Sequence, residues 1–277
     1  MESPTKTKSF LLVGTVILTV LTLCSFFVGK YPLTLSGLLS GDAMQWRVFL
    51  TLCASRAVIG AIGGFVLGVT GFVYQTVFRN PLASPDIIGA SSGASAGAAF
   101  GILFLSGAMA VTLSAFAGAI CSVLLALALS SLTAEKDGKS IVLSGIAVHS
   151  LAQTALVCLK LLADPEKQLA SIEYWIMGSL NGISLYSIGG NTALCLICLV
   201  GMFLLYRQIL LLSLDDQEGR LLGVNVTQIR LIVLLIATLA ASSVISMTGL
   251  ISFISLLAPH GARLLFKNNR LSTMLFS

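Results

Sequence analysis

The sequence predicts an all-α protein, a polytopic bundle of transmembrane helices that forms a single domain over residues 1–277. Three observations support this prediction. Of the 277 residues, 56% are hydrophobic and only 10% are charged, and the mean hydropathy is +0.99. Soluble domains carry about 25% charged residues, so this composition excludes an ordinary soluble protein. The apolar residues gather in runs long enough to cross a bilayer, and the basic residues gather between alternate runs.

The apolar runs predict about eight membrane segments. They lie near residues 9–29, 45–77, 88–105, 108–132, 140–163, 187–206 and 227–248, with a shorter one at about 249–266. The first run is as long as a full span and no small-residue cleavage site follows it, so we expect a retained span and not a signal peptide. The run 45–77 exceeds one upright span, and we expect it to tilt or protrude. Residues 164–186 combine charged and aromatic residues, which is typical of an interfacial helix.

The distribution of Lys and Arg predicts a cytoplasmic N-terminus. With this orientation the inner segments hold eleven basic residues: Lys6, Lys8, Arg79, Lys136, Lys139, Arg207, Arg220, Arg230, Arg263, Lys267 and Arg270. The outer segments hold three: Lys30, Arg47 and Lys167. Short cytoplasmic loops carry such an excess of basic residues. Topology therefore explains the net charge of +5, and no nucleic-acid partner is needed.

Two rows of glycine at four-residue spacing predict close helix packing. One row is Gly60, Gly64 and Gly68, and the other is Gly89, Gly93, Gly97 and Gly101. Because an α-helix turns once in 3.6 residues, each row lies nearly on one face, where a neighbouring backbone can approach closely. We expect packing contacts in these rows, although small residues would also leave room beside a path for a large solute.

Two motifs of soluble enzymes occur here in unsuitable settings. The segment Gly89–Gly93 matches the Gly-x-Ser-x-Gly nucleophile elbow, but that motif needs a strand-to-helix turn and here it opens an apolar helix. An intramembrane serine hydrolase would need His149 or His260 beside one of its serines, and it is kept as a minor alternative. Cys195 and Cys198 form a Cys-x-x-Cys inside an apolar run, where a packing role is the better interpretation.

No catalytic residue, metal site or cofactor is predicted. The residues His, Cys, Asp and Glu show no metal-ligand spacing, and the segment Gly138–Ser140 lacks the glycine that a phosphate-binding loop requires five positions earlier. Only Arg56 and Lys160 are charges within spans, and both can extend toward an interface. A proton- or ion-coupled carrier would bury an acidic residue at mid-membrane, and none does so here. An energy source outside this chain is therefore favoured.

The loop at residues 210–226 predicts a short amphipathic helix on the cytoplasmic side. Three acidic residues, Asp215, Asp216 and Glu218, lie near its start, and Arg220 precedes Gly223, a suitable C-cap. This order matches the preference of the helix dipole for negative charge at the N-terminus. Because an acidic helix contrasts with the basic residues around it, we interpret it as a docking element for a cytoplasmic partner. A merely solvated loop is the alternative.

Four elements of the chain resemble, in order, motifs of the FecCD family, the permease subunits of ABC importers. The first is Gln75 with Arg79-Asn80-Pro81-Leu82-Ala83, Pro85 and Gly89, and the second is Trp175-x-x-Gly178-Ser179-Leu180. The third is Leu222-Gly223-Val224-Asn225-Val226, and the fourth is Gly249-x-x-x-Phe253 followed by Ala258-Pro259-His260-x-x-Arg263. The resemblance covers most of the chain, and the conserved order of four elements makes it specific.

The resemblance implies a type II ABC importer permease for a ferric siderophore, haem or a cobalamin-like chelate in the cell membrane of a bacterium. It implies a second permease subunit, identical or different, two cytoplasmic ATPase subunits that bind ATP, and an extracytoplasmic solute-binding protein. The ATPases would dock on the coupling loop 212–224 through Asp215, Asp216, Glu218, Arg220, Leu222 and Gly223. Residues of the path or gate would be Arg56, Gln75, Arg79, Asn80, Pro81, Pro85, Gly89, Trp175, Gly178, Pro259, His260 and Arg263. The chain itself would be no enzyme.

The chain departs from the family pattern in three places. Before the second span, Cys53-Ala-Ser-Arg56 keeps only the second arginine of the family's Arg-x-Pro-Arg. In the coupling loop Gly219 replaces an alanine, which should loosen the helix by about 1 kcal/mol. Family members usually have about ten spans, and we expect the last two to be absent from this sequence. The alternative function is therefore a transport-incompetent remnant or a partner-binding membrane protein, and the sequence does not identify the chelate.

Overall fold

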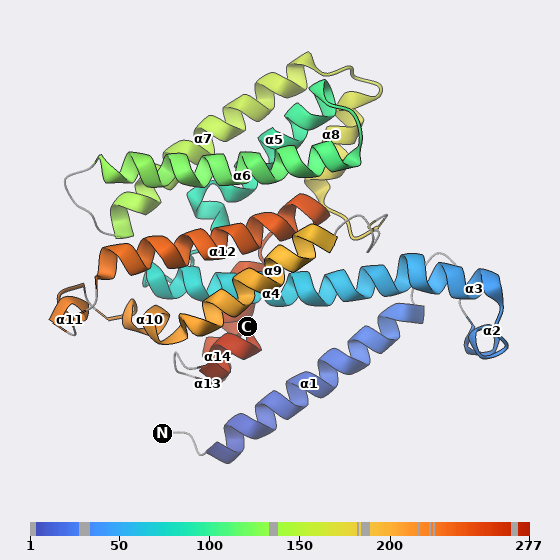
Figure 1. The fold of residues 1–277 in the computed structure, drawn as a ribbon, viewed down its shortest axis with the longest axis horizontal. Helices are drawn as coiled ribbons and strands as arrows, with labels where there is room; N and C mark the ends of the chain where they lie inside the picture. The colour runs from blue at the N-terminus through green and yellow to red at the C-terminus, as the bar shows by residue number, and fades with distance from the viewer. Residues whose placement is uncertain are drawn as a thin grey trace.

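The computed structural model describes residues 4–27, 34–132, 138–181, 183, 189–214, 216–221, 223, 225–266 and 271–277, and within them it is built from helices joined by short connections (Figure 1). The predicted all-α fold class is confirmed. The α-helices are α1 (Pro4–Phe27), α2 (Leu35–Leu39), α3 (Ala43–Val48), α4 (Ser55–Val77), α5 (Ala90–Phe104), α6 (Ala108–Ser131), α7 (Gly138–Leu162), α8 (Gln168–Met177), α9 (Gly189–Leu204), α10 (Tyr206–Leu211), α11 (Asp216–Leu221), α12 (Val226–Thr248), α13 (Ile254–Phe266) and α14 (Leu271–Phe276). A π-helical segment, η1, covers Phe49–Ala54, and a 3₁₀ turn, η2, covers Pro85–Ile88.

Helices α4 and α12 form the centre of the bundle. They are in contact with each other, and α6 and α9 pack against α12 (Figure 1). Their shared core includes Phe72 and Leu234, which are fully buried. The hydroxyl of Tyr74 is hydrogen bonded to Thr238 Oγ1 at 2.6 Å, which joins the two helices by a buried polar contact. Because such groups cost free energy when they are left unpaired in an apolar interior, this pair also favours the observed register of α4 against α12.

The second glycine row packs as predicted, with α5 lying directly on α6. A Cβ placed at Gly93 would collide with the carbonyl oxygen of Gly118, and one placed at Gly97 would collide with that of Ser114. Gly118 lies in the same seam from the side of α6, where its own Cβ would lie 3.0 Å from the Cα of Gly97. The two backbones therefore touch, and the row supplies van der Waals contact between helices. In the first row, Gly68 packs against the carbonyl group of Ser277 beyond α14.

By length and hydropathy, four helical segments among the described residues are able to cross a membrane: 43–77, 108–131, 140–162 and 226–248. Shorter apolar helices cover 12–26, 90–104, 189–204 and 254–266, so each predicted segment corresponds to a helix. The long run is one continuous helical segment of 35 residues, Ala43–Val77, that contains the π-helical stretch η1. Its tilt in a membrane stays a prediction.

Two predicted helices are shorter in the structure than in the sequence-based assignment. Within residues 164–186 the helix is α8, because Gly178 at φ 70° ends it and residues 179–181 are not helical. Residues 182 and 184–188 lie outside the described part of the chain. The last apolar run, 249–266, becomes helical only at Ile254, because Gly249 at φ 71° and Phe253 at φ 70° have left-handed backbone that interrupts a helix.

Candidate functional site

The turn between α4 and α5 is a compact structure with two left-handed residues, Arg79 at φ 51° and Gly89 at φ 83°. The side chain of Asn80 accepts a hydrogen bond from the backbone N–H of Leu82 at 2.9 Å, which closes an Asx turn. Pro85 is the first residue of η2, where its missing N–H costs nothing. The first sequence element therefore consists of residues that the turn itself requires, and it presents the side chains of Arg79 and Leu82 at its surface.

Gly89 also permits a close approach between this turn and α7. A Cβ at Gly89 would lie 3.3 Å from the backbone nitrogen of His149, and one at Gly145 would lie 2.5 Å from the carbonyl oxygen of Ile87. The positive φ of Gly89 and this crowding both select glycine. The backbone of His149 thus lies in this helix-packing contact.

The first and fourth sequence elements meet where α4 contacts α13. Gln75 is 1% exposed; its Nε2 donates to the carbonyl oxygen of Leu256 at 3.0 Å, and its Oε1 accepts from Arg263 Nη1 at 3.0 Å. A second nitrogen of Arg263, Nη2, donates to Thr76 Oγ1 at 3.0 Å. The same guanidinium lies 5.2 Å from the ring centroid of Phe72. Arg263 therefore contacts three residues on one face of α4, through two hydrogen bonds and a cation–π contact.

Beside this contact is a small cavity whose lining residues are far apart in the sequence, since Gln75 and Arg263 are separated by 188 residues. It has a volume of about 270 Å³. Its lining residues are Gln75, Thr76, Arg79, Pro81, Ser213 and Arg263. The tertiary structure thus gathers predicted path or gate residues next to the connection that leads to α11. Pro259 is buried inside α13, and His260 of the same helix is exposed.

The predicted acidic helix is present as α11, and its first residue faces the bundle. Asp216 accepts two hydrogen bonds from Arg230 Nη2, at 2.8 Å to Oδ1 and 3.0 Å to Oδ2. The same carboxylate forms an ion pair with Arg79. Arg230 is 2% exposed and lies in the first turns of α12. One carboxylate is therefore shared by guanidinium groups from the end of α4 and the start of α12.

The other residues of α11 divide between a packed side and an open side. Gly219 is buried, and a Cβ there would lie 2.8 Å from Val226 Cγ2, so the replacement of alanine by glycine lets α11 lie against the start of α12. Glu218 is exposed, and Leu221 is 87% exposed. Gly223 has φ 78°, as expected for a helix C-cap. Asp215, Leu222 and the side chain of Arg220 lie outside the described part of the structure.

The second and fourth sequence elements meet at the opposite end of α12. The backbone N–H of Ser179 donates to the carbonyl oxygen of Thr248 at 2.7 Å. A Cβ at Gly249 would lie 2.8 Å from the Cα of Gly178, and it would collide with the carbonyl oxygen of Trp175. Both glycines have positive φ. This glycine-to-glycine contact ties the end of α8 to the end of α12, and neither position accepts a side chain.

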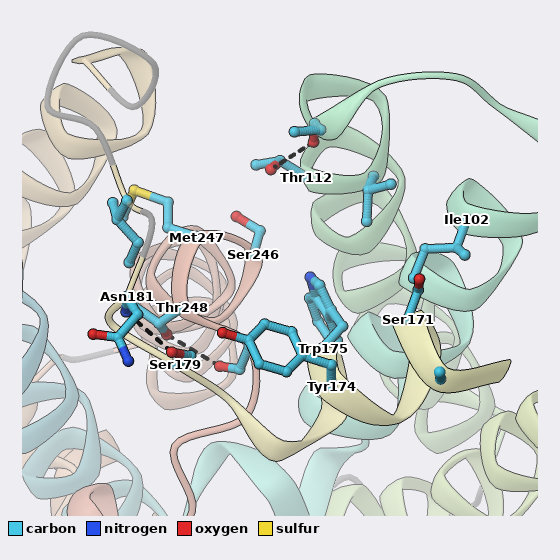
Figure 2. Close-up of a pocket in the computed structure, with 15 residues that line it drawn as sticks. Ile102, Thr112, Ser171, Tyr174, Trp175, Ser179, Asn181, Ser246, Met247 and Thr248 are labelled. Atoms are coloured by element: carbon cyan, nitrogen blue, oxygen red, sulfur yellow. Dashed lines mark hydrogen bonds between the residues drawn. The ribbon is translucent and has the colours of Figure 1, made fainter. Parts of the chain in front are cut away.

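A cavity of about 740 Å³ opens beside this junction. Figure 2 shows Tyr174 and Trp175 of α8 on one side of it, and Ser246 and Met247 of α12 on another. Its lining residues are Ile102, Ala108, Val111, Thr112, Ala170, Ser171, Tyr174, Trp175, Ser179, Asn181, Ile183, Ser246, Met247, Thr248 and Gly249. Among these described residues none carries a charge, so the cavity offers aromatic, aliphatic, hydroxyl and amide surfaces.

The two intramembrane charges have structural partners. Arg56 Nη2 donates to the carbonyl oxygen of Ser25 at 3.0 Å, which is in the last turn of α1. Lys160 at the end of α7 forms a 2.9 Å ion pair with Glu173 of α8. Arg56 thereby holds α1, which is otherwise largely exposed, against the long helical segment. Their extension toward an interface stays a prediction.

The nucleophile-elbow interpretation receives no support from the geometry. Ser91 donates to the carboxylate of Asp86 directly, without an intervening imidazole. Nδ1 of His149 has no hydrogen-bond partner among the described residues. Within the same part of the chain, no group of three His, Cys, Asp or Glu could hold a metal ion. In a serine hydrolase of this kind the serine hydroxyl is hydrogen bonded to an imidazole, whereas the partner of Ser91 is a carboxylate.

Sequence reasoning missed Thr76 and Ser213, which line the small cavity, and the buried charge of this site, Arg230. It was counted among the basic residues of the inner loops, although the structure buries it against Asp216. The available signal was its position one turn inside an apolar helix, where a charge requires a partner. The partner could not be chosen from sequence, since the loop offers several carboxylates.

This arrangement defines the class of protein: a polytopic helical membrane protein with a structured polar site where α4, α11 and α12 meet. The model of the FecCD transport family matches residues 17–277, and the chain belongs to this family. Its members are membrane permeases, so the chain is of the transporter-subunit class, and the resemblance found from the four elements is confirmed.

Individual relatives agree with this assignment. The hemin transport system permease of Yersinia pestis is 32% identical over 259 residues, which cover 90% of this chain and 76% of the relative. The ferric enterobactin transport system permease of Escherichia coli is 33% identical, with coverages of 79% and 64%. A solved structure described as an inward-facing conformation of a metal-chelate type ABC transporter superposes with a TM-score of 0.88 at 26% identity. It covers 97% of this chain and 85% of the solved chain.

Proposed function

We propose that this chain is the permease subunit of an ABC importer that moves an iron–siderophore complex, haem or a similar bulky chelate across the membrane. The observation that carries the proposal is the family match over residues 17–277, together with a shared fold at a TM-score of 0.88. The relatives named above transport hemin and ferric enterobactin by their descriptions. ATP hydrolysis then belongs to separate subunits, which supply the energy for transport. An ion gradient is not favoured as the energy source, because the sequence places no acidic residue at mid-membrane to couple it.

The neutral cavity beside α8 supports a chelate as the substrate. Its volume of about 740 Å³ falls in the range of sites for drug-sized molecules, about 300–1,000 Å³. A molybdate permease from Haemophilus influenzae is also similar, at 27% identity. A path for a small oxyanion favours cationic residues, and none lines this cavity. Its Tyr174, Trp175 and Met247 suit an extended organic ligand.

The ATPase is proposed to dock on the open side of α11. Leu221 is 87% exposed, and Glu218 on the same helix is exposed as well. Leu82, in the turn that contains Arg79, is 65% exposed. Isolated apolar side chains on a polar rim are the usual anchors of a protein interface. The other predicted partners, a second permease subunit and an extracytoplasmic solute-binding protein, complete the importer.

The test is reconstitution with the cognate ATPase and solute-binding protein in proteoliposomes, with uptake of radioiron-labelled haemin, radioiron-labelled enterobactin and molybdate measured in parallel. ATP-dependent uptake of an iron chelate and none of molybdate is expected. Uptake of molybdate alone would contradict the substrate class, and uptake of none of the probes would contradict the importer and favour a partner-binding membrane protein.

The docking surface has its own variant and control. Leu221→Asp should abolish co-purification of the ATPase, because it places a charge on the anchor. Leu39→Asp is the matched control, since Leu39 is 81% exposed and lies on α2, at the opposite end of the long helical segment (Figure 1). Equal retention of the ATPase by both variants would remove α11 from the interface.

A further inference from the structure

The carboxylate of Asp216 is the point at which three helices are joined. Arg79 reaches it from the end of α4, and Arg230 reaches it from α12 through hydrogen bonds of 2.8 and 3.0 Å. Arg79 is 137 residues away in sequence and Arg230 is 14 residues away. The side chain of Asp216 is 24% exposed, that of Arg79 is 37% exposed and that of Arg230 is 3% exposed. The carboxylate therefore points away from the open side of α11.

The environment makes this contact hard to replace. A guanidinium as buried as that of Arg230 must keep a counter-ion, because an unpaired charge in an apolar interior is strongly unfavourable. Arg79 is held in left-handed backbone by the turn that contains it, which directs its side chain toward α11. The nearest other carboxylate on α11, Glu218, is exposed. Asp216 is thus a counter-ion shared by both arginines.

We infer that Asp216 is a positioning residue that locks α11 to α4 and α12, so that any displacement of α11 moves the ends of both helices together. The consequence of this lock rests on the proposed function: the lock transmits the motion of the ATPase to the membrane spans. It differs from the expectation that Asp216 contacts the ATPase directly. Docking falls to the open side of α11, whereas Asp216 makes the docked helix rigid with the bundle.

Hydrogen–deuterium exchange of the permease alone, in lipid nanodiscs, tests the lock without any partner. Asp216→Asn should raise amide exchange in α11 by about tenfold, because the charge-assisted hydrogen bonds to both arginines weaken together. Asp216→Glu should retain most of the protection, since it keeps the carboxylate. Glu218→Gln is the matched control for exchange, because it makes the same carboxylate-to-amide change on the exposed side. Unchanged exchange in Asp216→Asn would overturn the inference.

Loss of the counter-ion can unfold a protein that buries an arginine, so a second variant is needed. The double variant Asp216→Asn with Arg230→Met removes the buried charge and fills its volume with an apolar side chain. We expect it to fold and to show α11 exchange at least as fast as Asp216→Asn alone. Wild-type protection of α11 in this folded double variant would overturn the lock.

The complete importer tests the consequence. With the ATPase and solute-binding protein present, Asp216→Asn should keep ATP hydrolysis and ATPase co-purification while the iron chelate moved per ATP falls by about tenfold, in parallel with α11 exchange. Loss of co-purification without a change in exchange would mean that Asp216 is a docking residue, which contradicts the inference. If the wild type transports neither haemin nor ferric enterobactin, the proposed function fails, and the exchange measurement still decides whether the lock exists.

Discussion

The α5–α6 seam provides a sharp test of the structure, because one substitution is expected to have opposite effects at two glycines. Gly97 lies in the seam, where an added Cβ would collide with the carbonyl oxygen of Ser114 and would lie 3.2 Å from the Cα of Ala115. Gly64 lies on α4 beside a cavity of about 450 Å³, and its Cβ would have no neighbour within 4 Å. Both residues are partly buried helix positions in apolar surroundings.

The magnitude follows from the geometry. Carbon atoms pack at about 3.5–4.0 Å, so the backbone of α6 must move outward to admit the methyl group, and even a gap of about 0.5–1 Å forfeits a quarter to a half of each dispersion contact. Overpacking of this kind costs about 1–3 kcal/mol. At Gly64 the same change only adds helix propensity, which is favourable by up to about 1 kcal/mol.

The measurement is the apparent unfolding temperature of the purified permease in one detergent and at one heating rate. Gly97→Ala is expected to lower it by about 3–10 °C, whereas Gly64→Ala should leave it unchanged or raise it slightly. Equal shifts at both positions would refute the reasoning, since they would show that the helix backbone and not the seam decides the effect. A still lower unfolding temperature in Gly97→Leu, whose side chain is larger than that of Gly97→Ala, would support the reasoning.

Three further predictions concern single polar contacts. Arg263→Met should lower the apparent unfolding temperature by several degrees, because it breaks two hydrogen bonds to α4 and the cation–π contact. Arg263→Lys should recover only part of this loss, and full recovery would show that charge alone matters. Arg56→Ala should raise amide hydrogen exchange near the end of α1, because it removes the donor to the Ser25 carbonyl. Exchange in α12 is the internal reference, and unchanged exchange in α1 would show that apolar packing alone holds this helix. Tyr74→Phe should cost about 1 kcal/mol in denaturant titration, since Thr238 keeps its hydrogen bond to the α12 backbone, and a cost above about 3 kcal/mol would indicate a larger role in the register of the two helices.

The sequence predicted the helices well because their signals are local. Apolar runs of about 20 residues, the glycine spacing and the acidic start of α11 each depend on neighbours within a few turns. The four sequence elements also led to the correct family. The boundaries of α8 and α13 were less accurate, because Gly178, Gly249 and Phe253 end or delay these helices through backbone conformations that hydropathy does not encode.

The contacts of the site were beyond sequence reasoning for a different reason. Asp216 was selected for its charge and its place in a loop, and both properties are compatible with an exposed docking residue. Its partners come from positions 14 and 137 residues away, so they depend on how α4 and α12 pack. Likewise, Gln75 and Arg263 were each recognised, but their mutual hydrogen bond spans 188 residues.

By itself, the sequence determined the membrane class, the approximate spans, the glycine face along which α5 packs against a neighbour, and the family. These follow from composition, helical periodicity and short motifs, which act over a few residues. Only the tertiary structure decided that Arg230 is buried, that Asp216 is shared between two arginines, and that Gly178 meets Gly249. The physical reason is that a carboxylate or a glycine can satisfy many local patterns equally, whereas burial admits only the partner that packing brings within contact distance.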